Sequence, residues 1–337
     1  MTGSRSGDQE RVSSRVMHVV TIAALVAVLW AWSSGRNAVA GTTLLAAWRF
    51  GLAATAISLV AAVLEWFQSL QWGEWANTVS PAAVDHLWYA ACVLWLCPAV
   101  AVLGARRPGH GAWCGFVMIP LLLVLEWPVT GVAVAGWVSG ARLGPVLEGV
   151  RLDWPERIGW LIVLVLGTGN YLLTRRWAAV LGGAAGVLAM LWPLTGLVTD
   201  GESSGMVRLT GSVVLAASLW WAGVGSRGVL AETDDDRRRR LDCAWGDFVE
   251  AYGLVWAVRL SARVNEELAR ISGGGVLGPG GIEFADGDRV SDAERDAVYC
   301  RAEETLRWLW SRFVDEAWVE SRLGAGAVLG AKERQAL

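Results

Sequence analysis

Long apolar runs with few charged residues dominate the first two thirds of the chain. A run of about 18 or more such residues can cross the hydrocarbon core of a bilayer as a helix. Seven runs fit this description, some near the short end of that range. They are Val16–Trp32, Ala46–Phe67, Leu87–Leu103, Trp113–Val134, Ile158–Leu173, Trp177–Val198 and Leu209–Val224. The pattern predicts an all-α fold, with a polytopic transmembrane helix bundle of about seven spans over residues 1–225.

After Gly225 the apolar runs give way to charged, amphipathic patterns. A long helix is expected from Thr233, which can cap it, to the glycine run that follows Ser272. Its apolar positions recur at helical spacing and need a partner surface. They are Trp245, Val249, Tyr252, Trp256, Leu260, Val264, Leu268 and Ile271.

The expected partner is a second helix, which a capping box of Ser291 and Glu294 would open. Between the two helices, Asp286-Gly287 is typical of the turn of a small hairpin. Residues 226–337 are therefore expected to form a small helical domain with a hairpin or loop insert. In this domain, the apolar stripes with Trp308, Trp310 and Trp318 are expected to supply a surface for a protein partner.

Composition supports a membrane protein and excludes several other classes. Hydrophobic residues make up 54% of the 337 residues and charged residues 18%, which excludes a disordered chain. The net charge of −3 comes without a basic patch large enough for a phosphate backbone, so no nucleic-acid partner is expected. The chain has 22 Trp but only 3 His and 5 Cys. Tryptophan favours the lipid headgroup layer, and we interpret this wealth as an interfacial belt.

Arginines near the ends of the spans predict the orientation. Counting them favours a cytoplasmic C-terminal domain in a bacterial inner (cytoplasmic) membrane, with the N-terminus on the opposite face. The first run could instead be a cleaved signal peptide, although Trp30 and Trp32 make a poor cleavage site. The basic residues assigned to the inner interface include Arg106, Arg107, Arg175, Arg176, Arg237, Arg238, Arg239 and Arg240. Arg208 falls on the outer face.

Glu126 is the most informative polar residue of the predicted spans, because a carboxylate in hydrocarbon costs about 2.5–3.5 kcal/mol on insertion scales. Arg49 in the second run could lie at a similar depth and pair with it. The alternatives are an ion- or proton-coupling role for Glu126, a structural pair with Arg49, and a position near the interface.

His18 in the first run and His86 at the start of the third could together ligate a haem or a metal. Trp72-Gly73-Glu74-Trp75 bears a faint likeness to the Trp-rich loops of haem-handling membrane proteins. The cysteines form no Cys-x-x-Cys pattern, and Cys92 and Cys97 lack a motif that would mark a nucleophile. No cofactor or metal is expected.

Gly182 and Gly186 form a Gly-x-x-x-Gly pair in the sixth run. Small residues at this spacing let two helices approach closely. We interpret the pair as packing within the chain, with a homodimer seam as the alternative.

Three stretches together resemble an uncharacterised family of bacterial multi-pass membrane proteins with a C-terminal helical cytosolic domain. They are Leu96–Pro108, Tyr252–Trp256 with Arg263-Val264-Asn265, and Phe313–Trp318. The resemblance covers most of the chain after about Leu87. It implies the architecture and carries no activity or catalytic residues.

The leading hypothesis is thus a non-enzymatic integral membrane subunit or scaffold whose cytosolic domain binds a protein. An ion- or proton-coupled transporter that uses Glu126 is the alternative. A membrane-embedded enzyme or haem-handling protein is the third reading.

Overall fold

The chain is mostly helical in a computed structural model, which describes residues 3–70, 80–106, 109–115, 119, 125, 150–197, 201–225, 237–272, 274–285 and 290–324. It divides into two compact units. The first unit comprises most of the residues up to Arg227. The second comprises the residues from Gly228 onward together with Ala40–Thr43 and the start of the connection after α4, at Ala105 and Arg106.

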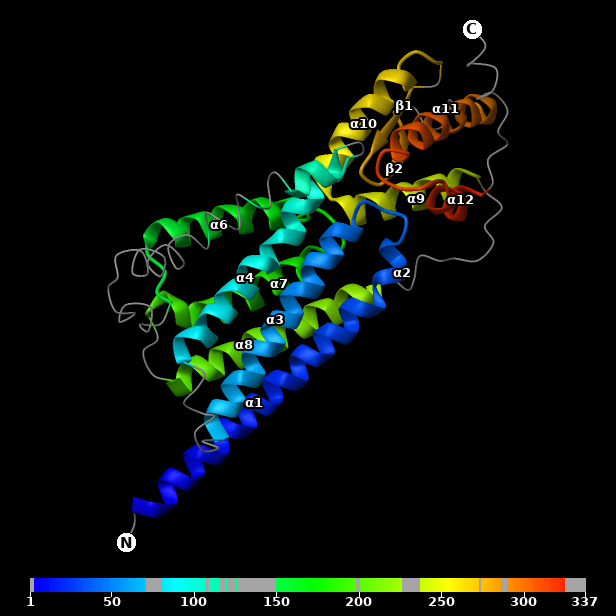
Figure 1. The fold of residues 1–337 in the computed structure, drawn as a ribbon. Coiled ribbons are helices and arrows are strands. Elements are labelled where there is room, and N and C mark those ends of the chain that lie inside the picture. Colours follow the sequence, from blue (N-terminus) through cyan, green and yellow to red (C-terminus); the bar gives the residue numbers. More distant parts are fainter. Residues whose placement is uncertain are drawn as a thin grey trace. The chain divides into compact units, whose positions relative to one another are not determined.

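The first unit is a bundle of long helices (Figure 1). Helices α1 and α3, α3 and α4, α1 and α8, and α7 and α8 are the main packed pairs. Its elements are α1 (Gly3–Ser34), α2 (Arg36–Val39), α3 (Leu45–Leu70), α4 (Pro81–Leu103), α6 (Trp154–Gly169), α7 (Trp177–Leu191), the short 3₁₀ helix η3 (Trp192–Thr195) and α8 (Gly201–Gly225).

Five helices among the described residues are long and apolar enough to cross a membrane. They are Val12–Ser34, Leu45–Leu70, Pro81–Leu103, Trp177–Thr195 and Ser203–Gly223. Five of the seven runs thus correspond to such helices. The run Trp113–Val134 lies mostly outside the described residues. The run Ile158–Leu173 falls on α6, whose 16 residues cover about 24 Å, short of the hydrocarbon thickness of about 30 Å.

Large apolar side chains point outward from this unit, which is compatible with contact with lipid. On α6, Leu161 and Leu166 are 55% and 60% exposed, and Trp220 and Trp221 on α8 are 58% and 67% exposed. The interfacial-belt interpretation does not extend to every tryptophan, because Trp88 and Trp160 are fully buried in the core. These two indoles pack with Tyr89 and Met190 in the same apolar cluster.

Glycines set the distance between α7 and α8. A Cβ on Gly186 would lie 2.8 Å from the carbonyl oxygen of Gly211, and one on Gly182 would lie 2.4 Å from Ser218 Oγ. The Gly-x-x-x-Gly pair therefore serves packing within the chain, since α8 occupies its face.

The second unit contains four helices and one hairpin among its described residues. They are α9 (Arg237–Tyr252), α10 (Leu254–Leu268), β1 (Gly275–Gly278), β2 (Gly281–Phe284), α11 (Asp292–Trp310) and α12 (Glu316–Leu323). The capping box at the start of α11 is confirmed, with Ser291 Oγ accepting from the Glu294 amide and Glu294 accepting from the Ser291 amide.

The second domain differs from the expectation in one helix and has a hairpin at a position that was not predicted. The long helix is broken at Gly253, whose φ of +77° lies in the left-handed region that favours glycine, so the apolar stripe is shared between α9 and α10. The hairpin lies earlier than expected. Its strands pair antiparallel with Gly278 opposite Gly281, so Pro279 and Gly280 form the turn. Asp286-Gly287 lies outside the described residues.

An aromatic cluster forms the core of this unit. Phe248 stacks on Tyr252 with ring centroids 4.5 Å apart and on Trp310 at 5.8 Å, and Phe313 meets it edge to face. The expectation that Trp310 and Trp318 would form an exposed surface was therefore wrong, because they are 0% and 8% exposed and pack against each other. Trp308 remains at the surface, 55% exposed.

The connection between α2 and α3 is built into this second unit. Thr42 forms an antiparallel bridge with Val314, the Thr43 amide donates to Phe313 O at 2.9 Å, and the Asp315 amide donates to Gly41 O at 2.8 Å. The hydroxyls of Thr43 and Tyr252 are 3.3 Å apart, and that of Tyr252 also donates to Phe313 O. A loop between two predicted spans thus completes the C-terminal unit.

Candidate functional site

A cluster of charged side chains lies inside the first unit, where three helices meet. Arg208 of α8 donates from Nη1 to Glu65 Oε1 of α3 and from Nη2 to Asp85 Oδ1 of α4, both at 2.6 Å. Its guanidinium lies 5.4 Å from the ring centroid of Trp88, and the indole of Trp88 donates to Glu65 Oε2 at 3.3 Å. We call these three charged residues the Arg208 cluster.

The side chains of the Arg208 cluster are mostly buried. The side chains of Arg208, Glu65 and Asp85 are 6%, 19% and 30% exposed. Taking three charges out of water is expensive, and only close pairing in good geometry offsets the cost. Arg208 Nε has no hydrogen-bond partner among the described residues, so one buried donor remains unsatisfied.

Two carboxylates on one guanidinium carry a net charge of −1. In a medium of low dielectric constant, such an excess attracts a cation. His18 of α1 lies close enough to interact electrostatically with both Glu65 and Arg208. Its own hydroxyl neighbour is Ser14, whose Oγ is 3.5 Å from His18 Nε2. Four helices therefore contribute polar groups to one place, whose net negative charge can hold a cation.

The polar residues predicted to lie within the membrane differ in their positions in the structure. Glu126 lies outside the described residues, so its pairing with Arg49 stays a prediction. Arg49 is exposed in the second turn of α3. His18 belongs to the surroundings of the Arg208 cluster, whereas His86 is half-buried next to Asp85 on α4. Among the described residues, no three His, Cys, Asp or Glu side chains gather as a metal site.

Sequence reasoning missed the Arg208 cluster because it treated each charge as an end marker of a span. A usable signal was nevertheless present. Glu65 closes the second predicted span, Asp85 precedes the third and Arg208 precedes the seventh. In the predicted topology these three positions share the outer face, and opposite charges at one level of a bundle are expected to pair.

The cysteines of the first unit behave as packing residues. Cys92 and Cys97 are buried, and their thiols lie 3.9 Å and 3.6 Å from backbone carbonyl oxygens. Cys114 differs from them in having a histidine neighbour. Its Sγ is 3.6 Å from Nε2 of His110, one helical turn earlier.

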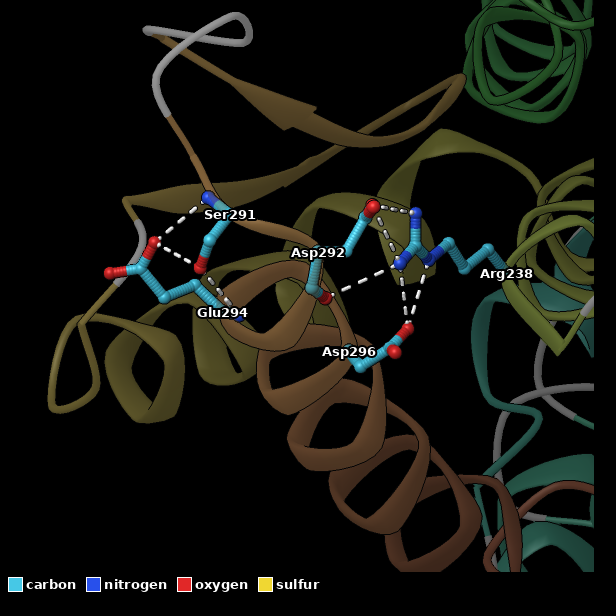
Figure 2. A network of polar contacts seen from close by, with 5 residues as sticks. All are labelled: Arg238, Ser291, Asp292, Glu294 and Asp296. Carbon is cyan, nitrogen blue, oxygen red and sulfur yellow. Dashed lines mark hydrogen bonds and ion pairs between the residues drawn. The ribbon is translucent and has the colours of Figure 1, made fainter.

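The interfacial arginines have distinct surroundings. Arg106 and Arg175 are exposed, Arg176 is half-buried, and Arg107 lies outside the described residues. In the second unit, Arg238 lies against the start of α11 (Figure 2), where it donates from Nε to Asp296 at 3.0 Å and from Nη1 to Asp292 at 3.2 Å. Hydrogen bonds to Asp296 and Asp292 raise the pKa of Arg238. Arg238 thus ties two helices of its unit together.

Glu303 of α11 is the centre of a second charged group. It is 7% exposed and accepts from Arg237 Nε at 2.6 Å and from Arg307 Nε at 2.8 Å. The hydrogen bond to Glu303 raises the pKa of Arg237. These three residues, which we call the Glu303 cluster, join α9 to α11.

Comparison of the chain with protein-family models, with curated proteins and with solved structures found no match. The functional argument therefore depends on the residues of this chain.

Proposed function

We propose that this chain is a multi-pass integral membrane protein that serves as a non-enzymatic subunit or scaffold. In this proposal it has about seven spans in a bacterial inner membrane, and its C-terminal unit faces the cytoplasm and binds a protein partner. The proposal includes membership of the family of bacterial multi-pass membrane proteins that the chain resembles.

One observation carries the proposal: Ala40–Thr43 belongs to the C-terminal unit. Backbone hydrogen bonds from Thr43 and Asp315 join this loop to the segment between α11 and α12. The chain therefore enters the C-terminal unit at three points: between α2 and α3, after α4, and after α8. A partner that binds this unit is tied to several separate points of the bundle, as suits a protein that holds another at the membrane.

The proposed orientation has a direct test in a native residue. Cys243 on α9 is exposed. A membrane-impermeant maleimide should label Cys243 in inside-out vesicles and leave it unlabelled in intact spheroplasts. Cys243→Ser is the control that assigns the label. Equal labelling of Cys243 in intact spheroplasts would place the C-terminal unit outside and contradict the proposed orientation.

The partner surface is proposed around Trp308, which is 55% exposed and stacks with Arg312 at 4.7 Å from its ring centroid. Trp and Arg are enriched among residues that dominate binding energy at interfaces. The full-length protein, purified from native membranes after crosslinking, should retain a partner that Trp308→Ser loses. Val276→Ser, at an equally exposed apolar position of β1, should retain it. A wild-type protein without a stable companion would contradict the subunit proposal.

The Arg208 cluster favours a second candidate, an ion- or proton-coupled transporter. In this candidate function the Arg208 cluster, with its net negative charge, couples the ion or proton in place of Glu126. Purified protein in liposomes should then conduct protons or cations, and Glu65→Gln should abolish the flux. Asp153→Asn, at an exposed carboxylate at the start of α6, should leave it unchanged. If the wild-type protein conducted neither protons nor cations, the transporter proposal would be contradicted and the Arg208 cluster would have a structural role.

A further inference from the structure

One end of α7 combines an apolar groove with basic and aromatic side chains. The groove has a volume of about 280 Å³ and lies between α7 and α8. Its lining consists of Ala178 and Ala179 from α7 and of Val214, Ala217, Ser218 and Trp221 from α8. The α8 positions span two helical turns, so the groove is about 10 Å long.

The groove has a geometric cause. Gly186 and Gly211 bring the two helices into backbone contact, where a Cβ on Gly211 would meet Gly186 O at 2.6 Å. Toward the start of α7 the facing residues are alanines, which are too short to fill the space beside the exposed indole of Trp221. The only hydroxyl in the lining, that of Ser218, donates to Val214 O at 2.7 Å. The groove therefore offers an apolar surface to an apolar occupant.

Positive charge is concentrated at the same end. Arg175 and Arg176 directly precede α7, and Arg176 occupies the N-cap position. The N-terminal end of a helix carries a partial positive charge and favours anions. Trp177 follows at the first helical position, 50% exposed, and Trp221 closes the groove at 67% exposed. Exposed indoles of this kind prefer the headgroup layer.

We propose that this end of α7 and α8 is a binding site for an anionic phospholipid. The headgroup phosphate lies against Arg175, Arg176 and the start of α7, and one acyl chain lies in the groove along Ala178 and Ala217. Charge complementarity selects the headgroup, because basic residues at a membrane interface attract anionic lipids. The groove distinguishes this site from a merely basic surface, since it requires an acyl chain joined to the anion.

The test is a lipid titration of the full-length, delipidated protein in detergent, followed by native mass spectrometry. Phosphatidylglycerol is the anionic probe and phosphatidylcholine the zwitterionic one. Wild-type protein should prefer phosphatidylglycerol. Arg175→Gln with Arg176→Gln should weaken its binding about 30-fold, because each basic residue near an anionic surface contributes roughly a fivefold factor. Arg36→Gln, at an exposed arginine of α2, should bind like the wild type.

A second variant tests the groove without changing charge. Ala217→Phe fills the groove from an exposed position of α8 and should lower phosphatidylglycerol binding at least tenfold. Equal binding of the two lipids by the wild type would overturn the proposal. Unchanged binding by the double arginine variant would do the same. If only the arginine variant lost binding, the lipid would be held by charge alone and the groove site would be refuted.

Discussion

The two units contain charged clusters of opposite composition. In the membrane-type unit a buried arginine, Arg208, lies between two carboxylates, whereas in the C-terminal unit a buried glutamate, Glu303, lies between two arginines. Both centres are withdrawn from solvent, but their partners differ. Glu65 and Asp85 are 19% and 30% exposed, while Arg307 and Arg237 are 25% and 50% exposed. We therefore expect the Arg208 cluster to be more costly to disturb, because only the Glu303 cluster has a flanking charge that is half exposed to water.

Replacing the centre of the Arg208 cluster should have the largest effect. Arg208→Gln leaves two partly buried carboxylates facing each other, and loss of one side of a buried pair costs about 3–5 kcal/mol. Thermal unfolding of the detergent-solubilised protein, followed by circular dichroism, should show this loss. Arg49→Gln, at an exposed arginine of α3, is the matched control and should leave the transition in place. Equal stability of both variants would remove the distinction between the two clusters.

Replacing the centre of the Glu303 cluster should cost less. Glu303→Gln leaves Arg307, which is 25% exposed, and Arg237, which is 50% exposed and can be solvated by water. We expect a loss of about 1.5–3 kcal/mol, the range for hydrogen bonds to a charged group. The measurement is the same unfolding transition. A larger loss than for Arg208→Gln would show that the environment of the flanking charges does not decide the cost.

Replacing a flanking residue of the Arg208 cluster should have a small effect. Asp85→Asn leaves Arg208 paired with Glu65 and brings the net charge of the cluster from −1 to 0. Loss of the attraction between Arg208 and Asp85 destabilises the fold, whereas removal of the excess negative charge stabilises it. Because the two effects oppose each other, the free energy of unfolding should change by less than about 1 kcal/mol. Destabilisation as large as that of Arg208→Gln would mean that the three residues act as one inseparable unit.

The smallest effect is expected at the exposed capping box of α11, and it should depend on pH. Hydrogen bonds from the backbone and side chain of Ser291 hold the pKa of Glu294 below its ordinary value of 4.5. This carboxylate therefore stabilises the fold above about pH 4.5, and the contribution disappears as the pH falls through the lowered value. Glu294→Gln should be slightly less stable than the wild type at neutral and higher pH and equally stable below the lowered pKa, so this part of the acid sensitivity is lost. Unchanged acid unfolding would contradict the role of the capping box.

Features that depend on neighbouring residues could be predicted from the sequence. Ser291 and Glu294 form the expected capping box because it depends only on residues three apart. Five apolar runs became helices of spanning length because their length and hydropathy are properties of the chain itself. The break at Gly253 was missed, since a glycine inside a periodic stripe is compatible with either a continuous or a broken helix.

The Arg208 cluster and the burial of Trp310 could not be read in the same way. Arg208 is 143 positions from Glu65 and 123 from Asp85, and no periodicity relates them. Trp310 and Trp308 are only two positions apart, yet one is fully buried and the other exposed, because the facing helix α9 covers one side of α11. Which tryptophan packs inside depends on that neighbour.

The sequence by itself determined where the chain is apolar and where it is amphipathic: long apolar runs up to about Gly225, followed by amphipathic helices. Those properties are sums over single residues, so they survive without knowledge of the fold. Only the tertiary structure decided which charges meet, that the Ala40–Thr43 loop completes the C-terminal unit, and where a groove opens beside α7. Such features arise from contacts between segments far apart in the chain, and their energies depend on distance and burial.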